Sequence, residues 1–94
     1  MSSANGQIES VTECGDLVTD IRVSDLTVAF GDDQVRVECD GHTTQGIYES
    51  TEGQAPMTLI AFQNDAGFIQ ISITEGDASG FLGIPVGTNV KISW

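Results

Sequence analysis

The chain has 94 residues, enough for one small domain with a modest core. Fourteen acidic residues against three Lys and Arg give a net charge of −11 at pH 7, which disfavours binding to nucleic acid and to anionic membrane surfaces. The sequence has no apolar run long enough for a membrane span, and its first six residues lack the features of a signal peptide, so we expect a cytoplasmic protein.

The N-terminal half of the chain has the alternating pattern of short strands. Residues 1–6 are small and polar, and we expect them to fray. Asp40-Gly41 is a strong signal for a tight hairpin turn, with residues 43–48 as the return strand. The other strands that we expect here are 7–13, 17–23, 26–30 and 34–39.

The C-terminal half predicts three more strands and one short helical turn. The strands are 56–63, 68–74 and 89–94, and the helical turn lies at 77–82, with Gly83 as its stop signal. About seven short strands separated by turn signals are typical of a sandwich or barrel. We therefore predict an all-β fold: a single domain over residues 1–94, forming a small closed or partly open barrel with Greek-key-like connections.

The cysteines and the single histidine do not indicate a special site. Cys14 and Cys39 are too few for a disulfide framework, and we expect reduced thiols. His42 has no partners at zinc-ligand spacing, so we predict no metal site. Trp94 at the C-terminus suits either a place in the core or a place in an interface.

Three stretches, in order and at similar spacing, carry a resemblance to a known family. They are GDLVTDI at 15–21, GQAPMTLI at 53–60 after the tyrosine at 48, and NDAGFIQISI at 64–73 with the glycines and apolar residues that follow to 92. The set is similar to the C-terminal barrel of the S-adenosylmethionine hydroxide adenosyltransferase family. The resemblance implies that barrel standing alone, without the family's N-terminal α/β catalytic domain.

The resemblance also implies positions for a ligand site. Family enzymes hold S-adenosylmethionine between the α/β domain and the barrel. Asp16 stands where the family has an asparagine that contacts the adenine edge, and Cys14 stands where it has an aromatic residue near the base. Val11 replaces an aspartate that binds the methionine ammonium group. These changes remove stacking area, hydrogen-bonding capacity and charge from the site.

The remaining family positions are changed as well. Asp65, followed by Ala66 in the same turn, replaces a serine that binds the methionine carboxylate, and Thr74 replaces an asparagine. A carboxylate at position 65 would repel the ligand's own carboxylate. The resemblance thus predicts a vestigial pocket in which binding of S-adenosylmethionine or adenosine is lost. Its residues are Val11, Cys14, Asp16, Asp65, Ala66 and Thr74.

These observations favour a non-catalytic barrel that binds another protein or itself. We expect no catalytic residues and no cofactor, and a partner that is either a second copy of the chain or a protein such as a separate α/β catalytic subunit. One alternative is that the chain is the ligand-binding subunit of a split adenosyltransferase or hydrolase. Another is a small-ligand binder of changed specificity, since Glu13, Asp16 and Asp65 would favour a cationic or amine-bearing ligand.

Overall fold

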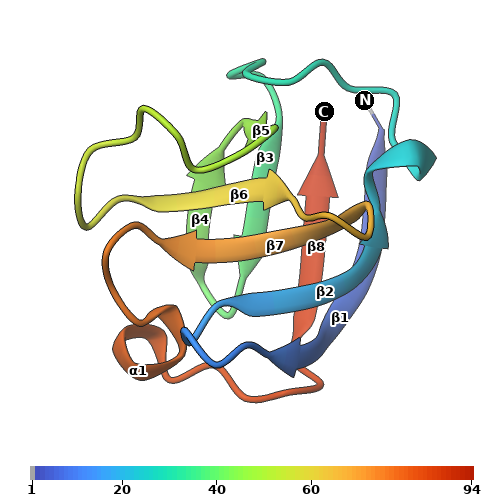
Figure 1. The fold of residues 1–94 in the computed structure, drawn as a ribbon. Coiled ribbons are helices and arrows are strands. Elements are labelled where there is room, and N and C mark those ends of the chain that lie inside the picture. Colours follow the sequence, from blue (N-terminus) through green and yellow to red (C-terminus); the bar gives the residue numbers. More distant parts are fainter. Residues whose placement is uncertain (1) are drawn as a thin grey trace.

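The computed structural model describes residues 2–94 and contains one eight-stranded sheet rolled into a nearly closed barrel (Figure 1). A short 3-10 helix, Val23–Asp25, and one α-helix, α1 (Ala78–Leu82), complete the fold. The strands are β1 (Ser3–Val11), β2 (Leu17–Arg22), β3 (Arg36–Cys39), β4 (His42–Gln45), β5 (Ile47–Tyr48), β6 (Leu59–Gln63), β7 (Phe68–Ile73) and β8 (Asn89–Ser93). The all-β barrel expected from the sequence is confirmed.

The strand order brings together segments that are far apart in the sequence. It is β4-β3-β8-β1-β2-β7-β6-β5, so β8 lies between β1 and β3, and β7 lies between β2 and β6. All pairs are antiparallel except β5 with β6. The barrel approaches closure where Thr44 Oγ1 of β4 donates a hydrogen bond of 3.1 Å to the carbonyl oxygen of Leu59 in β6.

Alternation along the strands sends one row of side chains into the barrel. Because successive side chains of a strand point to opposite faces, β7 buries Ile69, Ile71 and Ile73, while Gln70 lies on the other face. Burial of an isoleucine side chain stabilises the folded state by about 1.5–3 kcal/mol. Aliphatic side chains of Ile, Val and Leu make up most of the core.

The expectation that residues 1–6 fray is wrong for residues 2–6, and Met1 lies outside the described residues. β1 begins at Ser3 and pairs with β8 over five positions. The backbone amide of Ser2 donates to the Trp94 oxygen at 2.7 Å, and the Trp94 amide donates to the Ser2 oxygen at 2.9 Å. A polar N-terminal segment stays ordered here because β8 supplies a full set of backbone partners.

The expected strand at 26–30 is not formed. Leu26 is buried and Val28 is half-buried, so the alternation reflects burial, but this segment pairs with no strand within residues 2–94. It crosses one end of the barrel between the 3-10 helix and β3 (Figure 1). Trp94 is half-buried, packs against the core, and donates from Nε1 to Thr27 Oγ1 at 3.0 Å.

Residues with positive φ decide where several strands end. Asp40 (φ 50°) and Gly41 (φ 81°) form the two-residue turn between β3 and β4, as predicted. Gly46 (φ 83°) divides the expected return strand into β4 and β5. Met57 (φ 59°) keeps the chain in a turn, so β6 begins at Leu59 and not at the expected position 56.

The helix expected at 77–82 is confirmed as α1, and both of its ends are capped. The Asp77 side chain accepts a hydrogen bond from the Gly80 amide, and Gly83 ends the helix with φ 64°. The Ser79 amide donates to the Gly15 oxygen at 2.8 Å, which fixes α1 against the β1–β2 turn. Neither helix within residues 2–94 has the length and apolar character needed to cross a membrane.

The two thiols differ in their surroundings, and this difference is testable. Cys14 is exposed, whereas Cys39 is buried, and burial together with the nearby Asp40 carboxylate raises the pKa of Cys39 to about 11. Only thiolates react rapidly with a disulfide reagent. We expect dithionitrobenzoate at pH 8 to label Cys14 in the folded protein and to label Cys39 only after unfolding. Equal labelling rates in the Cys14→Ser and Cys39→Ser variants would contradict this.

The raised pKa of Cys39 also sets a direction for stability in alkali. Above the pKa of the unfolded thiol, near 9, the folded state binds more protons at this position than the unfolded state does. The stability that Cys39 contributes is therefore complete below pH 9 and is lost as the pH rises towards 11. Comparing the urea unfolding of the parent and Cys39→Ala proteins between pH 8 and 10.5 isolates this loss.

Candidate functional site

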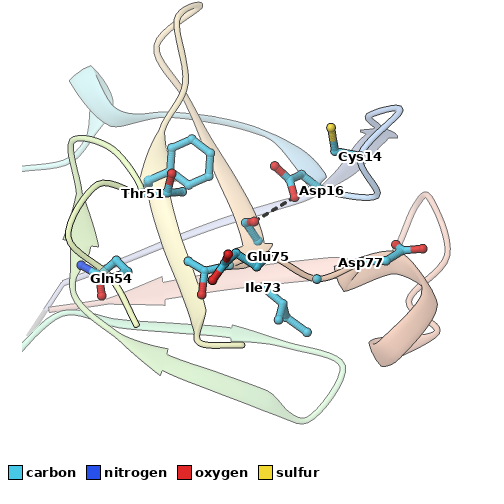
Figure 2. A pocket seen from close by; sticks show the side chains of 11 residues that line it. Cys14, Asp16, Thr51, Gln54, Ile73, Glu75 and Asp77 are labelled. Atoms are coloured by element: carbon cyan, nitrogen blue, oxygen red, sulfur yellow. Dashed lines mark hydrogen bonds between the residues drawn. The ribbon is translucent and has the colours of Figure 1, made fainter. Parts of the chain in front are cut away.

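A hollow of about 660 Å³ lies where the β1–β2 turn, β6, β7, the β7–α1 loop and the loop before β6 meet, and we call it the concavity (Figure 2). It is open to solvent on one side. Figure 2 places Cys14, Asp16 and Asp77 on one side, and Thr51 and Gln54 on the opposite side. The lining residues are Cys14, Asp16, Thr51, Gln54, Phe62, Ser72, Ile73, Thr74, Glu75, Gly76 and Asp77.

The Asp16 carboxylate is held in place by two side chains of β7. Ser72 Oγ donates to its Oδ1 at 2.8 Å, and Gln70 Nε2 donates to its Oδ2 at 2.9 Å. Gln70 in turn accepts from Asn64 Nδ2 at 3.2 Å, and the Asp16 amide donates to Thr12 Oγ1 at 3.0 Å. The result is a continuous polar row from the β6–β7 turn to the β1–β2 turn, with the carboxylate at its centre.

This row follows from the period of β7. Gln70 and Ser72 are two residues apart, so both side chains lie on the same face of the strand, opposite Ile69 and Ile71. β2 is the antiparallel neighbour of β7, with Leu17 opposite Ile71. Asp16 immediately precedes Leu17, which brings its side chain alongside the polar face of β7.

Thr74 lines the concavity, and its hydroxyl group is hydrogen-bonded to the loop before β6. Its hydroxyl donates to the Ala55 oxygen and accepts from the Thr58 amide at 2.9 Å. The Met57 amide donates to the Thr74 oxygen at 2.7 Å. Thr74 therefore positions the wall that carries Gln54, and both hydrogen-bonding functions of its hydroxyl are used within the chain.

The structure brings together three of the six residues expected in a vestigial pocket. Cys14, Asp16 and Thr74 line the concavity, whereas Val11, Asp65 and Ala66 do not. Val11 ends β1 and is 39% exposed. Asp65 and Ala66 lie in the β6–β7 turn, where Asp65 lines a neighbouring hollow of about 260 Å³. The two hollows share Thr51 and Phe62.

Sequence reasoning missed the residues that hold Asp16. The alternating pattern assigns Gln70 and Ser72 only to a strand, yet their position on its polar face is a usable signal. Thr51, Gln54 and Phe62 have no such signal, because their approach depends on how the loop before β6 folds back over the strand.

The concavity contains acidic groups and no basic ones. Asp16, Glu75 and Asp77 belong to its lining, which includes no Lys or Arg. Arg22 lies at the far end of β2, where its guanidinium carbon is 5.1 Å from the centre of the Phe68 ring. No group of three or more His, Cys, Asp or Glu within residues 2–94 is arranged to hold a metal ion. The arrangement suits a group that donates hydrogen bonds.

Comparisons with known proteins agree on the fold. A family model described as "SAM hydroxide adenosyltransferase C-terminal domain" matches residues 6–91. An uncharacterised conserved protein from Thermotoga maritima shares the fold with a TM-score of 0.83 and 25% identity, over 98% of this chain and 36% of that one. A conserved hypothetical protein from Thermus thermophilus follows with a TM-score of 0.79 and 18% identity, over 99% of this chain and 36% of that one.

The chain thus spans about a third of the length of these two solved structures. No curated protein matches it.

Proposed function

The chain belongs to the family of SAM hydroxide adenosyltransferase C-terminal domains, and on this premise we propose that it is a non-catalytic protein-interaction module. In this proposal, the concavity is one wall of a site that a partner protein completes. The observation that carries the proposal is the openness of the concavity beside a rigid polar row of Asn64, Gln70, Asp16 and Ser72.

The fixed conformation of this polar row favours a binding role over a catalytic one. A side chain held by two hydrogen bonds loses little further conformational entropy when a partner binds, which favours affinity. Asp16 is held in this way by Ser72 and Gln70. We give the barrel a binding role and no reaction step. The matched family region is a C-terminal domain, and the lining of the concavity offers hydrogen-bond acceptors that are held in position.

Charge favours a partner with basic groups over a second copy of the chain. A net charge of −11 makes two copies repel each other, most strongly at low salt. A partner with positive groups at its contact surface would associate faster and would weaken its binding as salt is added. We therefore place a basic protein partner ahead of self-association.

A capture experiment with a matched pair of variants tests the proposal. Thr51→Trp places a large side chain in the mouth of the concavity, and Ser24→Trp places the same side chain on the exposed 3-10 helix away from it. We expect immobilised parent protein and Ser24→Trp to retain the same protein from a lysate of the source organism. Thr51→Trp should retain at least about tenfold less, which corresponds to about 1.4 kcal/mol.

Two results would count against the module. One is equal capture by the Thr51→Trp and Ser24→Trp proteins. The other is a monomer by light scattering at both low and high salt, with no protein captured by the parent chain.

A second candidate function is the ligand-binding subunit of a split enzyme. Its support is that Cys14, Asp16 and Thr74, at the positions that the family resemblance implies for the ligand, line one concavity. A separate α/β protein would then supply the catalytic groups. Co-purification with such a protein and formation of adenosine from S-adenosylmethionine by the pair would support this function. A captured partner without that activity would support the interaction module alone.

A further inference from the structure

We infer that the concavity receives an arginine side chain of the partner protein, with its guanidinium group paired to the Asp16 carboxylate. This inference rests on the proposed interaction function and names the chemistry of the contact. Its first support is the orientation of the carboxylate. Both oxygens are fixed by hydrogen bonds, 2.8 Å from Ser72 Oγ and 2.9 Å from Gln70 Nε2.

The fixed carboxylate still has capacity for a ligand. A carboxylate offers about four acceptor positions on its two oxygens, and Ser72 and Gln70 occupy one on each oxygen. Within residues 2–94, no other side chain donates to Asp16, and its side chain is partly exposed in the concavity. One acceptor position on each of two adjacent oxygens suits a group with two parallel N–H donors.

Guanidinium fits this pattern better than ammonium does. Its planar fork presents paired N–H groups that meet the two oxygens of a carboxylate together, whereas an ammonium group acts as a point charge. An apolar surface for the stem of an arginine side chain is offered by the half-buried Phe62, which borders the same hollow and lies opposite Gln70 in the β6–β7 pair.

Charge selects a cation over a neutral molecule with the same donor pattern. A guanine base also presents two adjacent N–H donors, but it carries no charge. Glu75 and Asp77 add negative charge to the lining, and no Lys or Arg there offsets it. The Asp77 carboxylate also caps α1, so one of its oxygens remains bound to the Gly80 amide. Asp16 therefore makes the paired contact, and Glu75 adds attraction at longer range.

Titration by nuclear magnetic resonance with N-acetyl-arginine amide tests the contact directly. We expect saturable shifts confined to the amides around Asp16, Ser72 and Thr74 and to the side-chain amide of Gln70. N-acetyl-lysine amide should bind more weakly, and the neutral citrulline amide should cause no saturable shift. Guanosine separates the two sources of paired donors, and it should bind more weakly than the arginine probe.

Matched variants assign the contact to one carboxylate. Asp16→Asn should weaken binding of the arginine probe at least about tenfold, because the charge-assisted pair is lost. Asp25→Asn removes the same charge from the exposed 3-10 helix and should leave binding unchanged. Glu75→Gln, which leaves the Asp16 hydrogen bonds intact, should weaken binding about twofold to threefold. This variant keeps the test valid if Asp16→Asn alters the local fold.

The results that overturn the inference differ from those that overturn the proposed function. Equal binding by the Asp16→Asn and Asp25→Asn proteins, shifts spread outside the concavity, or guanosine binding more tightly than the arginine probe would each refute the arginine contact. If partner capture remains sensitive to Thr51→Trp after such a result, the interaction module stands. If the arginine probe binds as expected but no partner is captured, the interaction module fails instead.

Discussion

Replacing Gly15 with alanine is expected to lower the free energy of unfolding by about 2–3 kcal/mol, the sum of backbone strain and a lost helix cap. Gly15 has φ +88°, and a Cβ atom there would overlap Asp77 Oδ1 and lie 3.3 Å from the backbone Cα of Asp77. The Asp77 side chain would have to leave the Gly80 amide, and α1 would have to shift from the turn that holds it. For a domain of this size, the melting temperature should fall by roughly 10 °C or more.

The matched control for this variant is Gly53→Ala. Gly53 has φ +80°, close to that of Gly15, but an added Cβ would meet nothing within 4 Å. It therefore carries the backbone strain alone, about 1 kcal/mol. Urea unfolding of both variants separates the two contributions. Equal losses would mean that the contact between the β1–β2 turn and α1 adds nothing to stability.

Replacing Thr19 with valine, which has nearly the same shape, is expected to lower the free energy of unfolding by about 2–4 kcal/mol, because two buried backbone groups lose their partner. Thr19 is 1% exposed. Its hydroxyl donates to the Ile69 oxygen at 2.7 Å and accepts from the Ile21 amide at 3.2 Å. The pairing of β2 with β7 shifts in register between Val18 and Arg22, so this hydroxyl replaces regular hydrogen bonds of the sheet.

Thr19→Ser provides the control, since it keeps the hydroxyl and removes only the methyl group. We expect it to cost about 1 kcal/mol. Thermal or urea unfolding of the two variants gives the comparison, and crystal or solution structures check that the strand has not moved. A Thr19→Ser variant that is as unstable as Thr19→Val would show that packing of the methyl group, and not the hydroxyl, stabilises this part of β2.

The strands with a neighbour on each side were largely predictable from the sequence. Residues 68–74 alternate clearly and form β7, and the Asp40-Gly41 pair marks the turn between β3 and β4. The segment 26–30 alternates as well but lacks a strand beside it, and no local pattern reveals whether a partner strand exists. Pairing between distant segments is decided by the whole barrel, which also explains the order of residues 2–6 beside β8.

The candidate site was predictable only in part, for a related reason. Cys14, Asp16 and Thr74 were selected through the family resemblance, and they line one concavity. That resemblance gives positions but not contacts, so it did not identify Ser72 and Gln70 as the donors to Asp16. The contact depends on the register of β2 against β7.

The incomplete closure between β4 and β6 has a consequence for how the barrel moves. In the described part of the chain these strands are not hydrogen-bonded neighbours in the sheet, and the Thr44 hydroxyl links them by a side-chain hydrogen bond to the Leu59 carbonyl oxygen. Local opening occurs most easily where few backbone hydrogen bonds must break. We therefore expect the barrel to open first at this seam between β4 and β6. β6 carries Phe62, whereas Asp16 is bound to β7. Phe62 thus lies on the strand that borders this seam, one strand away from the β7 residues that hold Asp16, so opening at the seam reaches the Phe62 side of the concavity before the Asp16 side.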